Sequence, residues 1–121
     1  MEQEIVQLIR EIGVPANLLG YEYLKTALQL CMEDPDMMHK RMMPFYADIA
    51  KRHNTTWSKV ERALRYAIGT AWSAPFGELI EKCFPCPGDY RTGMPPVGEF
   101  LAVVAEELKL RVTGEGDLDY V

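Results

Sequence analysis

The chain has 121 residues, of which 48% are hydrophobic and 26% charged, and its formal net charge at pH 7 is −5. This length supports one domain with a single core and is too short for two. No apolar run approaches the length of a transmembrane helix, and the first residues, which include Glu2 and Glu4, do not resemble a signal peptide. Three cysteines favour a reducing compartment over a disulfide framework. We therefore expect a cytoplasmic protein that does not contact membranes.

Two amphipathic helices are predicted in the first third of the chain. The segment Glu4–Ile12 repeats apolar residues at helical spacing and should end at Gly13. A second helix is predicted from about Tyr21 to Glu33, and it should end before Pro35. The methionine-rich stretch MMHKRMM follows. Because thioether side chains adapt to irregular gaps, we expect it to pack against the core, and a peptide-binding surface is the alternative.

The segment between Phe45 and Trp72 has the parts of a helix-turn-helix. A short amphipathic helix precedes the polar turn formed by residues 53–56, and a longer helix from about Thr56 to Trp72 follows it. The longer helix can begin in two ways: with Thr56 as its N-cap, or with a capping box between Ser58 and Glu61. One face of this helix is apolar and should face the core. Its residues are Val60, Ala63, Leu64, Ala67, Ile68 and Ala71.

The opposite face of the longer helix carries side chains that can exchange hydrogen bonds with a DNA groove. They are Ser58, Lys59, Arg62, Arg65 and Tyr66, with Glu61 at the edge. Between Lys51 and Tyr66 the net charge is +4, which leaves −9 for the rest of the chain. Local positive charge favours phosphate contacts, and the acidic remainder would repel DNA from the other faces. A solvated face without a partner is the alternative that this pattern leaves open.

The C-terminal third is predicted to contain a short helix, a loop and a closing helix. The short helix is expected within Phe76–Cys83, and the stretch CFPCPGDYRTGMPP has the composition of a loop. The segment Pro96–Arg111 should form the closing helix, and residues 112–121 a loosely ordered acidic tail. Cys83 and Cys86 have the spacing of half a zinc site or of a redox dithiol. Since the chain has no second pair, we interpret them as structural or incidental thiols.

Three segments resemble, in the same order, the C-terminal DNA-binding effector domain of the stage-zero sporulation protein A, the master response regulator of sporulation in endospore-forming bacteria. They are EIGVPANLLGYEYLKTAL, YADIAKRHNTTWSKVERALRYAIGTAW and GEFLAVVAEELKLR. The resemblance implies an all-α domain over residues 1–111. It would have about six helices around the helix-turn-helix, an orthogonal bundle unlike a winged helix. Its long helix would enter the major groove of a short promoter element, and family members bind such elements in tandem as activators or repressors.

Carried over by position, the resemblance implies that Lys59, Glu61, Arg62, Arg65 and Tyr66 contact the bases. Lys59 and Tyr66 stand where the regulator usually has arginine and histidine, and the other three match. Lysine cannot form the planar bidentate pair that arginine makes with guanine, so we expect one base to be recognised less sharply. Contacts with phosphates are expected from residues at the turn. These residues are Arg52, His53, Asn54, Thr55 and Thr56.

The expected function is sequence-specific binding of double-stranded DNA and transcription regulation of the sporulation initiation type. No phosphate loop or nucleophile motif is present, so we expect neither an enzyme nor a cofactor. RNA polymerase and a second copy bound in tandem or as a homodimer are further expected partners. The regulator's receiver domain has no counterpart here, which predicts either a free-standing form or a domain of a longer protein. The alternative is a protein-interaction module of the same family that modulates a related regulator or RNA polymerase without strong DNA binding.

Overall fold

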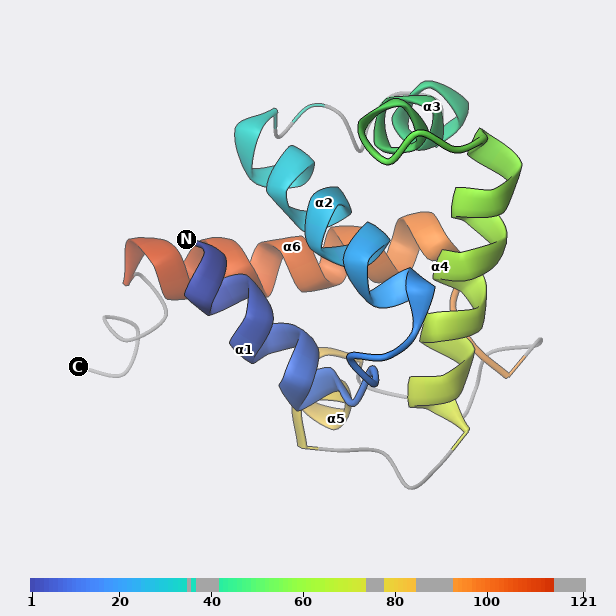
Figure 1. The fold of residues 1–121 in the computed structure, drawn as a ribbon. Helices are drawn as coiled ribbons and strands as arrows, with labels where there is room; N and C mark the ends of the chain where they lie inside the picture. Colours follow the sequence, from blue (N-terminus) through green and yellow to red (C-terminus); the bar gives the residue numbers. More distant parts are fainter. Residues whose placement is uncertain (35, 37–41, 74–77, 85–92, 115–121) are drawn as a thin grey trace.

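The computed structural model describes residues 1–34, 36, 42–73, 78–84 and 93–114, and these residues form six α-helices and no strand (Figure 1). The helices are α1 (Glu2–Ile12), α2 (Leu19–Glu33), α3 (Met42–Arg52), α4 (Trp57–Trp72), α5 (Glu78–Cys83) and α6 (Val97–Thr113). The prediction of an all-α domain of about six helices is confirmed. No described helix combines the length and the apolar character that a membrane span needs.

The helices cross one another steeply, as expected for an orthogonal bundle. α4 stands on one side of the molecule and crosses the long axis of α6, while α2 packs against α1, α4 and α6 (Figure 1). α3 packs against α4, and α5 lies against α1 and α6. α2 and α3 therefore form the main support of α4, and α6 contacts it less extensively.

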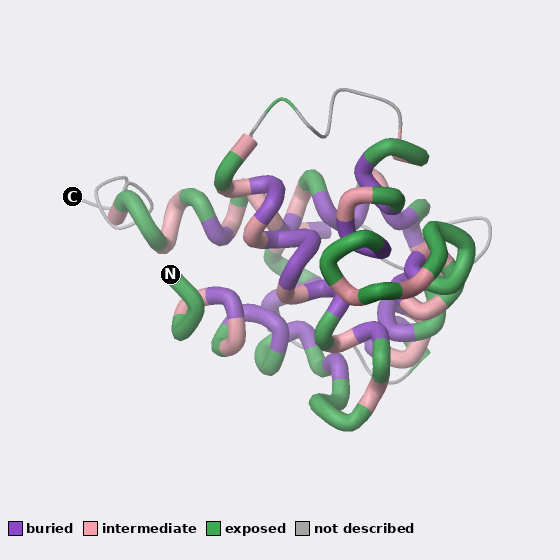
Figure 2. Tube along the Cα trace, turned by 45° about the horizontal axis from the view of Figure 1, so that its top comes forward, coloured by how far each residue is buried: buried purple, intermediate pink, exposed green. Residues whose placement is uncertain are grey.

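The core takes side chains from every helix, and the buried positions follow the inward side of each helix (Figure 2). The apolar face predicted for the longer helix is buried at every position except Ala63, which is half-buried. Leu110, an apolar residue of α6, is also only half-buried. At the end of α4, Trp72 meets Phe84 with ring centroids 5.1 Å apart, and Phe84 stacks on Phe100 at 5.9 Å. This aromatic cluster ties α4 to α5 and α6.

Most helix boundaries lie close to the predicted ones, and the differences occur at the ends. α3 begins at Met42, so the last two methionines of MMHKRMM belong to a helix, and residues 37–41 of this stretch lie outside the described part of the chain. α5 begins at Glu78, and α6 continues to Thr113, two residues into the segment predicted as the tail. Gly114, with a φ of 76°, ends α6 in the left-handed conformation that glycine adopts without strain. Residues 115–121, like the loop residues 85–92, lie outside the described part of the chain.

Gly20 lets the backbone of α2 lie directly against α4. A Cβ atom at this position would be 2.3 Å from the carbonyl oxygen of Ala63 and 2.8 Å from Cβ of Ala67. Both distances are shorter than non-bonded contacts allow, so only glycine fits at this crossing. The crossing fixes the inner face of α4 and therefore the direction of its outer face.

The turn between α3 and α4 is built from local hydrogen bonds. Asn54 adopts a positive φ of 54°, and the backbone N–H of Thr55 donates to the carbonyl of Ala50 at 2.9 Å. Thr56 is the N-cap of α4, since its Oγ1 accepts from the backbone N–H of Lys59 at 3.4 Å. The hydrogen bond of Thr56 selects the first of the two predicted helix starts. The alternative prediction, a capping box of Ser58 with Glu61, is wrong.

Candidate DNA-binding interface

The outer side of α4 presents all the side chains that the sequence assigned to base contacts. Ser58, Lys59, Arg62, Arg65 and Tyr66 are exposed, and we call these five side chains the recognition face. Glu61 is half-buried beside them. The arrangement follows from the 3.6-residue period, because the same helix buries its opposite side against α2 and α3.

Two cations at the centre of the recognition face are free of ion pairs. Within the described part of the chain, neither Lys59 nor Arg62 has a carboxylate within ion-pair distance. Some other basic residues are paired with carboxylates: Lys25 lies 3.4 Å from Glu22, and Arg111 binds Glu11 at 2.7 Å. Unpaired cations on an exposed helix can bind an anionic partner without first breaking a contact within the protein.

Arg65 is oriented by Glu61, one helical turn earlier. Its Nη2 donates to Glu61 Oε1, and the Arg65 side chain remains 58% exposed. Beneath this pair lies Tyr46 of α3, whose pKa is raised to about 12, mainly by burial and further by the charge of Glu61. The phenol therefore stays neutral at ordinary pH. The pair draws the Arg65 guanidinium toward the edge of the recognition face and away from its centre.

The recognition face ends near Tyr66, because a later segment covers the next turn of α4. A Cβ atom on Gly69 would lie 3.4 Å from Sδ of Met94, so this methionine packs over the helix at that point. The open stretch from Ser58 to Tyr66 is about 12 Å long at the rise of an α-helix. It can face about four base pairs, given their spacing along the duplex.

The turn residues differ in how free they are to contact phosphates. Asn54 and Thr56 are exposed, whereas Thr55 is half-buried. Arg52 is exposed but lies 3.8 Å from Glu33 and 3.6 Å from Asp48. It can reach a phosphate only by leaving these carboxylates.

His53 has a structural contact that the sequence did not reveal. Its Nε2 lies 2.7 Å from Oγ1 of Thr26, and its ring meets Tyr23 edge-on with centroids 4.9 Å apart. His53 was expected to contact a phosphate or to cap the preceding helix. One of its ring nitrogens anchors the turn to α2, and its contact with a phosphate stays a prediction. No local signal identifies the contact with Thr26, because this partner lies 27 residues earlier.

Trp57 is an exposed aromatic side chain that was not among the predicted DNA-binding residues. It is the first residue of α4 and exposes 44% of its surface. A tryptophan directly after an N-cap threonine is a signal that could have been used, since large exposed aromatic side chains are enriched at binding surfaces.

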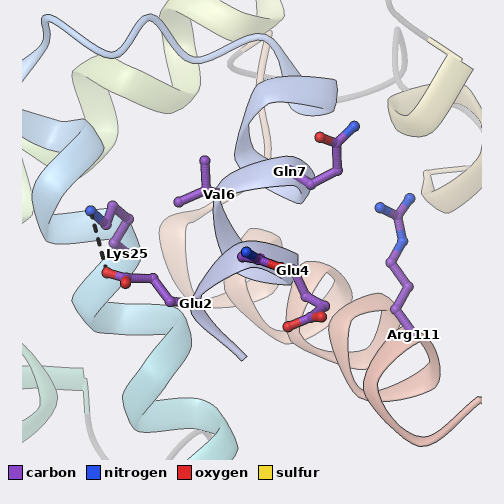
Figure 3. Close-up of a pocket in the computed structure, with 7 residues that line it drawn as sticks. Glu2, Glu4, Val6, Gln7, Lys25 and Arg111 are labelled. Carbon is purple, nitrogen blue, oxygen red and sulfur yellow. Dashed lines mark ion pairs between the residues drawn. The ribbon is translucent and has the colours of Figure 1, made fainter.

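The side of the molecule away from α4 carries mixed charge. A hollow of about 750 Å³ there is lined by Glu2, Gln3, Glu4, Val6, Gln7, Lys25 and Arg111 (Figure 3). Lys25 lies 3.9 Å from Glu2 across it, and Arg111 is directed toward α1. Carboxylates at its rim make this hollow unsuitable for a polyanion, so the recognition face is the better place for one.

Cys31 and Cys83, the two cysteines that the structure describes, show no feature of a reactive or metal-binding site. Cys31 is buried in α2, and burial raises its pKa to about 11. Burial, and then the charge of Glu107, also raise the pKa of Cys83. Raised pKa values keep both thiols protonated and therefore weakly nucleophilic. Cys86, the other cysteine of the predicted pair, lies outside the described residues.

A comparison with protein families agrees with this geometry. Residues 5–108 match the family described as Sporulation initiation factor Spo0A C terminal, and the match spans from α1 to α6 with the turn and all of α4. This is a family of DNA-binding domains of transcription factors and not a family of enzymes. Because the match covers most of the 121 residues, the chain belongs to the family of Spo0A C-terminal domains, the DNA-binding effector domains of sporulation regulators.

Proposed function

We propose that this protein binds a short element of double-stranded DNA in a sequence-specific manner and regulates transcription from promoters that carry the element. In this proposal α4 lies in the major groove with its recognition face toward the bases. The observation that carries the proposal is the position of Lys59 and Arg62 on a helix whose other side is held rigidly by the core. Both are exposed, and neither has an ion pair with any residue that the structure describes. Rigid elements place such side chains more accurately than loops do.

The side chains of the recognition face have different roles in this proposal. Arg62, at its centre, can donate two parallel hydrogen bonds to O6 and N7 of a guanine. At the edge, Glu61 can accept from a cytosine N4 group through Oε2, while Arg65 keeps its contact with Oε1 and donates its other N–H groups to a guanine or a phosphate. Lys59 and Ser58 lie nearer the start of the helix and can reach bases or backbone. Asn54, Thr56 and Arg52 would hold the adjacent phosphates and set the position of α4 in the groove.

A footprint of about four base pairs supports binding by more than one copy. A sequence of this length recurs about once in a few hundred base pairs, too often to define a promoter. Tandem or homodimeric binding would multiply the specificity, and this is the arrangement that we propose. Contact with RNA polymerase would then be made by surfaces away from α4.

The test is a comparison of two arginine variants on DNA. The probes are a duplex selected by the protein from a random-sequence library and a shuffled duplex of the same composition, with dissociation constants measured by fluorescence anisotropy. Arg62→Ala should reduce the preference for the selected duplex by about 1–3 kcal/mol, because it removes a base contact. Arg52→Ala should weaken both duplexes by a similar factor, since a phosphate contact carries no sequence information.

Salt dependence provides a second measurement on the same probes. With roughly three to six phosphate contacts, the logarithm of the association constant should fall against the logarithm of salt concentration with a slope of about −3 to −5. An Arg62→Ala protein with unchanged preference between the duplexes would show that the recognition face is assigned wrongly.

A protein-interaction module is the second candidate, and one observation favours it. A groove of about 640 Å³ beside α4 is lined mainly by apolar side chains, with Glu61 and Arg65 at its rim. Its residues come from α3, from α4 and from the segment that leads into α6. If gel-shift titrations with selected and random duplexes gave no complex, while light scattering showed stable association with a related regulator, this function would replace DNA binding.

A further inference from the structure

The recognition face contains a depression that its charged composition does not suggest. A shallow pocket of about 480 Å³ lies between the side chains of Arg62, Arg65 and Tyr66, and its walls are almost entirely carbon. We call it the Tyr66 pocket. Tyr66 exposes 66% of its surface, so the ring lies open on the outer side of α4. An apolar pocket is thus placed among groups that otherwise form hydrogen bonds.

Two contacts described above keep the Tyr66 pocket open. Glu61 draws the Arg65 guanidinium to the edge of the face, so that it does not fold over the ring of Tyr66. One turn later, Gly69 has no side chain that could fill the pocket, and Met94 packs over Gly69 instead. Aliphatic stems of the two arginines and the tyrosine ring then remain as the walls of the pocket.

The major groove offers one apolar group that such a pocket can take. The edges of the bases present hydrogen-bond donors and acceptors, except at thymine, which also presents its 5-methyl group. A phosphate would not be held by carbon walls, because it requires hydrogen bonds or cations at short range. Apolar walls beside an arginine that can bind guanine therefore fit a thymine next to a guanine.

We infer that the Tyr66 pocket is a subsite for the 5-methyl group of a thymine, next to the base pair that Arg62 recognises. This inference rests on the proposed function, and it makes Tyr66 a residue that determines specificity through its ring and not through its hydroxyl group. Burial of one methyl group against the ring corresponds to about a fourfold gain in affinity.

The experiment replaces single thymines of the selected duplex by deoxyuridine, which removes the methyl group and leaves the hydrogen-bonding edge unchanged. Each thymine is replaced in turn, and dissociation constants are measured for the unaltered protein, Tyr66→Ala and Tyr66→Phe. For the unaltered protein, one position should weaken binding by about fourfold. Tyr66→Ala should bind the thymine and deoxyuridine duplexes equally, and Tyr66→Phe should retain the fourfold difference. Thermal unfolding checks that both variants fold.

The outcomes separate this inference from the proposal on which it rests. If the unaltered protein prefers no selected duplex over a shuffled one, DNA recognition itself fails and the subsite fails with it. If the selected duplex is preferred but no deoxyuridine weakens binding, or if the weakening persists in Tyr66→Ala, only the thymine subsite is wrong. Loss of the difference in Tyr66→Phe would also overturn it, because the hydroxyl group would then be the determinant.

Discussion

Gly20 has the most restrictive surroundings of the described glycines. Gly20→Ala would place a methyl group against the backbone of Ala63, where neither helix can give way without moving. We expect a loss of about 1–3 kcal/mol in the free energy of unfolding, measured by urea titration. Gly98→Ala is the matched control, because its Cβ would meet only the flexible side chain of Met42 at 3.4 Å. An equal loss in both variants would mean that the α2–α4 crossing is not the cause.

The exposure of individual side chains could be predicted from the sequence where helical periodicity decides it. Arg62 and Tyr66 are four residues apart, and both are exposed because Leu64 and Ala67 on the other side are buried. The contacts of polar groups could not be predicted in the same way. The hydrogen bond of His53 with Thr26 depends on how α2 crosses the turn, which no local pattern encodes.

At the level of the helices, Thr26 joins α2 to the helix-turn-helix. Thr26 as a whole is 9% exposed, and its hydroxyl group lies 2.7 Å from His53 Nε2. Thr26→Val keeps the shape but removes the hydrogen bond, so we expect a loss of about 1 kcal/mol in the free energy of unfolding. Thr70→Val, in α4, removes a hydroxyl group that donates to the carbonyl of Tyr66 in the same helix, and it should change stability much less. Thermal unfolding of both variants tests this, and a stable Thr26→Val protein would contradict it.

The type of each helix was predictable, but some helix ends were not. A strong local signal was sufficient at Gly13, where the chain leaves α1 with a φ of 99°, but at Thr56, which caps α4, the sequence also allowed a second helix start. At Met42 the sequence has no capping residue, and this side chain packs against α6 beside Gly98. A tertiary contact, which a single sequence does not show, accompanies the earlier start of α3.

For the whole molecule, Arg111 closes the bundle by joining the first helix to the last. It donates to Glu11 at 2.7 and 2.9 Å and to Glu107 at 3.0 Å. The hydrogen bonds from Arg111 lower the pKa of Glu11 below its usual 4.5. A carboxylate with a lowered pKa in the folded state stabilises the protein above its unfolded pKa, and the contribution is lost as the pH falls through the folded value.

Glu11→Gln should therefore reduce the free energy of unfolding by about 1 kcal/mol at pH 7, and by less as the pH falls below about 4.5. Urea titrations at pH 7, 5, 4 and 3.5 measure this difference. Glu106→Gln is the control, because this exposed residue of α6 has no ion pair within the described part of the chain. A difference between the unaltered protein and Glu11→Gln that stays constant with pH would show that the Arg111 contact is unimportant.

Arg111 also lines one hollow together with Glu2, Gln3 and Glu4, so the start of α1 lies near the end of α6, on the side of the bundle away from α4 (Figures 1 and 2). Met1 is exposed there. A fluorophore or an immobilising tag joined ahead of Met1 would thus stand clear of any bound duplex. Single molecules tethered by the N-terminus would expose α4 to the solution, where it could bind DNA that flows past.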